Sequence, residues 1–173
     1  MFTRCLRADF YKMKRSSVII AHIIIPIVVS AVFLAYYAIS GWNETDKITA
    51  FYETLGSAFP VLIGIFIAST MEQEQNAGAF QNLLTLRSRT AALFSKVVTL
   101  LVFGLFALLF TAVIFGFGFN MIHGHSIASM GLFVRAVLVM WLSAIPLYLI
   151  FEIFALHLRR LLPRVREGVC SVL

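Results

Sequence analysis

Four long apolar runs, separated by short charged connections, dominate this chain. The first runs from Val18 to Ile39 without an Asp, Glu, Lys or Arg, and the others span residues 51–70, 97–119 and 136–158. At about 1.5 Å of rise per residue, the first run makes a helix of about 33 Å, enough to cross a bilayer. In lipid, such a run satisfies its backbone hydrogen bonds internally only as a helix. The pattern therefore predicts four membrane-spanning helices.

The composition supports a membrane setting. The 173 residues are 61% hydrophobic and only 13% charged, which excludes an ordinary soluble enzyme. The 14 Lys and Arg outnumber the 8 Asp and Glu and could suggest a nucleic-acid partner. These charges flank the apolar runs, however, as they do in membrane proteins. We therefore expect the bilayer and no nucleic acid as the surroundings of this chain.

The placement of the basic residues predicts the orientation. All Lys and Arg except Lys47 and Arg135 lie in or beside three segments, the N-terminal stretch, the loop 71–95 and the tail 159–173. Basic residues accumulate in short loops that stay cytoplasmic, so both termini and this loop are predicted to be inside. A cleavable signal peptide is the alternative for the first run, but that run exceeds the usual apolar length. The expected fold is an all-α polytopic membrane protein of about four spans, N-in and C-in.

The loop after the second span carries the most informative motif. It begins as a polar patch that includes Glu72 and Glu74, and continues as Ala77-Gly78-Ala79-Phe80-Gln81-Asn82-Leu83-Leu84. Phe80, Leu83 and Leu84 have the i, i+3, i+4 spacing of one helix face. Glycine tolerates the turn from a membrane-normal to a membrane-parallel helix. The pattern predicts a short amphipathic helix on the cytoplasmic surface, where it can dock a partner.

This motif resembles the permease subunits of ABC-2-type exporters. In that family the second span leads into paired glutamates, a glycine and an amphipathic coupling helix that ends in paired leucines. The form found here is most similar to the immunity permeases of lantibiotic producers. The resemblance covers about residues 1–157 and includes the basic stretch before the first span.

The resemblance implies a two-part exporter in the bacterial plasma membrane. A separate ABC ATPase subunit would bind and hydrolyse ATP, and this chain would pair with a second permease subunit to expel a lantibiotic or similar amphipathic peptide. No G-x-x-x-x-G-K-[ST] loop occurs in the sequence, so we expect no cofactor and no catalysis in this chain. The implied contacts with the ATPase come from the coupling segment: Glu72, Glu74, Gly78, Phe80, Gln81, Leu83 and Leu84.

The chain departs from the family in its number of spans. Permeases of this kind usually have six, whereas residues 1–158 form a four-span permease domain and residues 159–173 form a basic tail. Because a basic tail follows the fourth span where two further spans are usual, we expect this chain to be a truncated or frameshifted permease.

Glu152 is the one carboxylate inside the fourth run, and intramembrane carboxylates are candidate functional groups because their burial is costly. It is a possible polar site for a proton or a cationic substrate, and the two alternatives are solvation at the membrane surface and pairing with a basic neighbour. The competing functions are therefore a proton-coupled multidrug carrier and a non-transporting accessory protein.

The spacing of His123 and His125 could hold a metal, but no third ligand is evident. Two solvent-exposed histidines without a metal are therefore the favoured interpretation.

Overall fold

A computed structural model describes residues 2–14, 16–76, 89–123 and 130–170. These residues form five helices: α1 Phe2–Met13, α2 Ser17–Ile39, α3 Glu44–Asn76, α5 Arg89–His123 and α6 Met130–Cys170. No strand occurs among the described residues. Four of the helices, α2, α3, α5 and α6, are long and apolar enough to cross a membrane. The predicted all-α fold with four spanning helices is confirmed.

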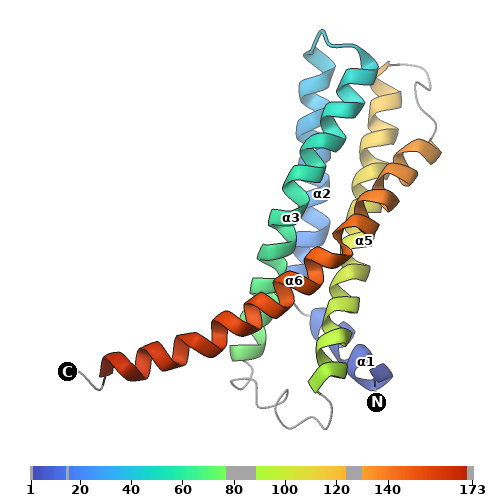
Figure 1. Cartoon of the computed structure of the whole chain (residues 1–173). Helices are drawn as coiled ribbons and strands as arrows, with labels where there is room; N and C mark the ends of the chain where they lie inside the picture. Colours follow the sequence, from blue (N-terminus) through green and yellow to red (C-terminus); the bar gives the residue numbers. More distant parts are fainter. Residues whose placement is uncertain (1, 15, 77–88, 124–129, 171–173) are drawn as a thin grey trace.

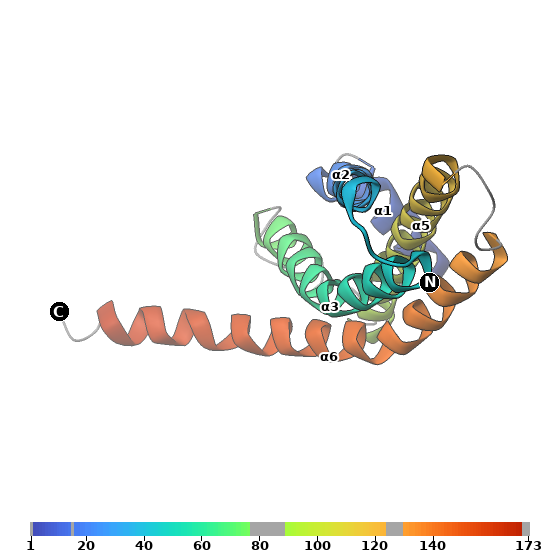
Figure 2. The same ribbon diagram turned by 90° about the horizontal axis from the view of Figure 1, so that it is seen from above.

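The four long helices stand side by side and α1 lies at one end of them (Figure 1). α5 is the central helix, because it packs against α1, α2 and α6, whereas α3 packs mainly against α6. Seen from above, the last part of α6 leaves the bundle and extends away from it (Figure 2). The region expected as a separate tail is therefore largely a continuation of the fourth helix, up to Cys170.

Local sequence explains where α2 begins and ends. The Ser16 hydroxyl accepts a hydrogen bond from the Val18 amide at 3.1 Å, which caps the helix N-terminus. Ser40 has extended backbone angles and ends the helix, and its amide donates to the Tyr36 carbonyl at 3.1 Å. The uncharged residues between these caps give a helix that matches the predicted run 18–39.

The other helices extend beyond the apolar runs that predicted them. α3 begins at Glu44 and reaches Asn76, and α5 begins at Arg89, so the expected loop 71–95 is partly helical. At the start of α3, Lys47 is only 5% exposed, and its ammonium donates a hydrogen bond of 2.9 Å to the Tyr37 carbonyl. That carbonyl belongs to the last turn of α2, where carbonyls lack helical partners. The helix can therefore start before the apolar run, because Lys47, the buried one of its first three charged residues, has an acceptor.

Aromatic rings form the core at the end of the bundle away from α1. Phe51 of α3 stacks on Phe115 of α5, with ring centroids 3.6 Å apart. Phe33 meets Phe51 edge to face at 5.3 Å, and Phe133 meets Phe115 at 6.2 Å. Such pairs add about 0.5–1.5 kcal/mol each beyond their buried area. This cluster joins α2, α3, α5 and α6 through rings that the sequence distributes over all four helices.

Candidate functional site

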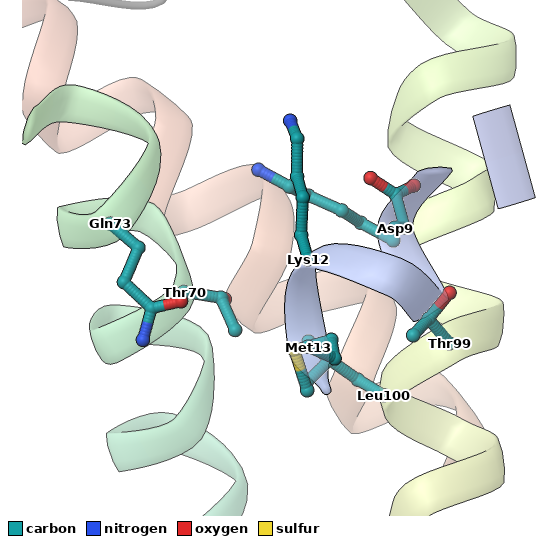
Figure 3. Close-up of a pocket in the computed structure, with 8 residues that line it drawn as sticks. Asp9, Lys12, Met13, Thr70, Gln73, Thr99 and Leu100 are labelled. Atoms are coloured by element: carbon teal, nitrogen blue, oxygen red, sulfur yellow. The ribbon is translucent and has the colours of Figure 1, made fainter. Parts of the chain in front are cut away.

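A cavity of about 250 Å³, most of whose lining residues are polar or charged, lies at the α1 end of the bundle. α1, α3 and α5 contribute its walls (Figure 3). The lining residues are Asp9, Lys12 and Met13 of α1, Thr70 and Gln73 of α3, and Lys96, Thr99 and Leu100 of α5. It is lined by the end of α3 and the first turns of α5, the helices that precede and follow the predicted coupling helix 78–84 in the sequence.

Two hydrogen bonds join separate helices around this cavity, and we call their four residues, Asp9, Ser16, Gln73 and Ser95, the polar junction. The Gln73 amide nitrogen donates to the Ser16 hydroxyl at 2.7 Å, which links the end of α3 to the start of α2. The Ser95 hydroxyl donates to the Asp9 carboxylate at 2.5 Å, which links α5 to α1. The Thr99 hydroxyl donates to the Ser95 carbonyl within α5 at 2.8 Å. The end of α3 and the start of α2 are thus in direct side-chain contact.

Apolar contacts support the same junction. Phe10 of α1 packs against Phe103 of α5 with ring centroids 5.4 Å apart. Met13 is 6% exposed and belongs to the main hydrophobic core. α1 is therefore anchored to α5 by a ring pair and a carboxylate, and is not simply a charged extension of the chain.

The residues of the predicted coupling segment fall into two groups. Glu72 is exposed near the end of α3, and Glu74 belongs to the same helix, although its side chain lies outside the described part. Gly78, Phe80, Gln81, Leu83 and Leu84 lie outside the described residues. The amphipathic helix expected over residues 78–84 therefore stays a prediction.

Glu152 is placed inside the bundle. It is 2% exposed and follows Phe133, Val137, Ala144 and Tyr148 on the buried face of α6. α5 and α6 run antiparallel, and the Phe115–Phe133 ring contact and the hydrogen bond from Trp141 to the Leu101 carbonyl set their register. This register brings Glu152 to the level of Lys96, which is 8% exposed. Among the two alternatives for this carboxylate, solvation at the membrane surface does not fit its burial.

The sequence alone did not indicate the polar junction. Ser16 and Gln73 are 57 residues apart, and Asp9 and Ser95 are 86 apart, so no local pattern links them. The one available signal was Asp9, the only acidic residue of the basic N-terminal stretch.

The two histidines considered as metal ligands are not both described. His123 is the last residue of α5, with its Nδ1 atom 2.9 Å from the Phe119 carbonyl oxygen, and His125 lies outside the described residues. In the described ranges no three His, Cys, Asp or Glu residues are grouped to hold a metal.

Four helices long and apolar enough to cross a membrane define the class as a polytopic membrane protein. Residues 5–164 match the family described as ABC-2 family transporter protein. The match covers well over half of the chain, which therefore belongs to the ABC-2 family of transporter membrane proteins. No curated protein and no solved structure matches the chain. Members of this family are the membrane components of transporters rather than catalytic subunits.

Proposed function

We propose that this chain is the permease subunit of an ABC exporter that removes a lantibiotic or a similar amphipathic peptide from the membrane. The observation that carries the proposal is the family match over residues 5–164 together with four spanning helices. The peptide substrate rests on the likeness of residues 77–84 to lantibiotic immunity permeases. A proton-coupled carrier is less favoured, because the family match points to ATP-driven transport.

The energy source would be a separate ABC ATPase, which binds ATP and docks on the coupling segment. Phe80, Leu83 and Leu84 would provide apolar anchors, and such anchors dominate helix-in-groove interfaces. Glu72 and Glu74 lie at the C-terminus of α3, where the helix dipole disfavours negative charge by about 0.3–1 kcal/mol. No basic residue occupies the last turn of α3. A basic groove on the ATPase would relieve this unfavourable placement.

The polar junction would transmit the movement of the ATPase into the membrane. A displacement of the segment 78–84 would first move the end of α3. The Gln73–Ser16 hydrogen bond would then carry the movement to α2, and α1 would follow α5 through the Asp9–Ser95 contact. In a permease dimer, this sequence of movements would change the access of the peptide to the two sides of the bilayer.

Co-expression with a candidate ABC ATPase from the same genome tests the partner. We expect the two proteins to purify together from detergent extracts through an affinity tag on the permease. A tagged, unrelated four-span membrane protein provides the control for nonspecific capture. Absence of the ATPase from the permease eluate, with both proteins expressed and folded, would contradict the proposal.

A further inference from the structure

A second cavity, of about 150 Å³, lies in the middle of the spanning helices. α2, α3 and α5 form its walls, and α6 contributes Tyr148. The residues of α5 that line it lie between Gly104 and Thr111, at the centre of the candidate span Leu93–His123. The centre of a span lies near the middle of the hydrocarbon layer of a bilayer. This cavity is therefore at the depth of the lipid acyl chains, away from the polar junction.

α2 and α3 are joined toward both ends of the bundle, and the cavity lies between these joints. At the α1 end, Gln73 of α3 donates a hydrogen bond to the Ser16 hydroxyl at the start of α2. At the other end, Lys47 of α3 donates to the carbonyl of Tyr37 in the last turns of α2. The residues of α2 that line the cavity fall between 21 and 33, within this interval. Over its whole length, α2 packs more extensively on α5 than on α3.

The cavity is open sideways between α2 and α3, and we call it the groove. Thr54 and Ala58 of α3 line it and are exposed, and Ile25 and Val29 of α2 line it and are half-buried. At this depth in a bilayer, the surroundings of an exposed side chain are lipid hydrocarbon. Lipid chains therefore reach the groove from the side, without displacement of a helix.

The groove has mostly apolar walls. Four of its lining residues carry polar side-chain atoms: His22, Thr54, Thr111 and Tyr148. The hydroxyls of both threonines already donate to backbone carbonyls of their own helices, each at 2.8 Å. The Nδ1 atom of His22 lies 2.7 Å from the carbonyl oxygen of Val18. A buried water normally makes about three hydrogen bonds, so water fits this groove poorly and an apolar occupant fits well.

We propose that the groove binds the terminal segment of one acyl chain of a bilayer lipid. An apolar cavity of about 150 Å³ accepts a benzene ring, so the groove holds on the order of six carbon atoms. An acyl chain in this place gives the lining side chains the dispersion contacts that a void would deny them. The chain lies between α2 and α3 where these helices do not pack on each other. The proposal is independent of the transported substrate and of the ATPase.

Photolabelling tests the occupant of the groove. The full chain is placed in phosphatidylcholine nanodiscs, in which a small fraction of the lipid carries a diazirine near the methyl end of one acyl chain. After irradiation, the labelled residues are mapped by tandem mass spectrometry. Leu108 and Thr111 line the groove and are each only 3% exposed, so lipids on the outer surface of the bundle do not reach them. We expect lipid adducts on both residues.

Two kinds of residue on α5 serve as internal controls. Phe106 and Phe110 are exposed at the same depth and should be labelled by ordinary surface lipid. Ala112 is fully buried but does not line the groove, so it should stay unlabelled. Labelled Phe106 and Phe110 with unlabelled Leu108 and Thr111 would overturn the proposal, and is the pattern expected if a second copy of the chain closes the groove. Equal labelling of Ala112 and Leu108 would also overturn it, because the label would then report general opening of the bundle.

A variant with a filled groove locates the adducts. Ala107→Phe places a ring in the groove from α5 and should abolish the adducts on Leu108 and Thr111. Ala35→Phe adds the same ring on the exposed side of α2 and should leave these adducts unchanged. Labelling of Phe106 in both variants shows that they are inserted in the bilayer. Adducts on Leu108 that persist in Ala107→Phe would contradict the assignment, and the wild-type pattern decides the proposal without any variant.

Discussion

Gln73 of α3 donates a hydrogen bond of 2.7 Å to the Ser16 hydroxyl, the same group that caps the N-terminus of α2. One oxygen atom thus holds two helix ends together at the α1 end of the bundle. Gln73 lies between Glu72 and Glu74, at the start of the segment proposed to dock the ATPase. This contact joins the start of the first span to the end of the second.

Replacement of Ser16 tests this junction. Ser16→Ala removes the cap of α2 and the acceptor of Gln73, and it should lower the free energy of unfolding by about 1 kcal/mol, with an upper value of about 2. The measurement is a reversible denaturant titration in detergent. Ser17→Ala, at an exposed position one residue later, provides the control and should stay within about 0.5 kcal/mol. Equal effects of the two substitutions would contradict the role of Ser16.

The packing of α5 on α6 depends on the absence of a side chain at Gly104. A Cβ atom at this position would approach the hydroxyl oxygen of Tyr148, which is 1% exposed, and would lie 3.4 Å from Cζ. Gly104→Ala should therefore lower the free energy of unfolding by about 1–3 kcal/mol. Gly64→Ala has no atom within 4 Å of its Cβ and should be neutral or stabilising.

A double variant separates the clash from other effects of Gly104→Ala. Tyr148→Phe removes only the hydroxyl oxygen, so Gly104→Ala should cost less in the Tyr148→Phe background than in the wild-type protein. The same cost in both backgrounds would show that the contact with the hydroxyl does not explain the loss of stability.

Lys47 stabilises the connection between α2 and α3. Its ammonium donates to the Tyr37 carbonyl at 2.9 Å, and Lys47→Met would leave that buried carbonyl without this donor. We expect a loss of about 1 kcal/mol in the free energy of unfolding. Lys14→Met makes the same chemical change at an exposed position and should have a small effect. A Lys47→Met variant as stable as Lys14→Met would refute the role assigned to this contact.

The coupling segment is tested by removal of its apolar face. Combined replacement of Phe80, Leu83 and Leu84 with serine should abolish co-purification with the ATPase and leave membrane insertion intact, because the docking anchors are lost while the spans are unchanged. Asn82→Ser, on the predicted opposite side of the same helix, is the matched control. Undiminished co-purification of the triple variant would show that these three residues do not dock the ATPase.

Residues that are close in sequence explain most of the fold. The uncharged run 18–39 predicts α2 almost to the residue, because length, apolar character and the Ser16 cap all act locally. The start of α3 could not be predicted in the same way, since Lys47 is accommodated by a carbonyl ten residues earlier on another helix. The charged residues at 44–47 suggested a loop between the first two spans, whereas the contact of Lys47 with the Tyr37 carbonyl allows a helix there.

The candidate sites were less accessible to sequence reasoning. Glu152 was recognised from its isolation in an apolar run, but its level relative to Lys96 depends on the register of α5 and α6. The surroundings of His22 gave no signal in the sequence, because only the folded chain shows that its Nδ1 atom lies 2.7 Å from the Val18 carbonyl oxygen and that its ring stacks on Phe66. Both features arise from contacts that no periodic pattern contains.

ATP-driven release of a labelled peptide from proteoliposomes tests the proposed export most directly. The vesicles would contain this chain and its ATPase, with a fluorescently labelled lantibiotic bound to the bilayer. We predict that ATP, but not a non-hydrolysable analogue, lowers the amount of bound peptide, and that the triple serine variant at Phe80, Leu83 and Leu84 abolishes this release. An unchanged amount of bound peptide, while the ATPase is assembled with the wild-type chain and hydrolyses ATP, would contradict the account.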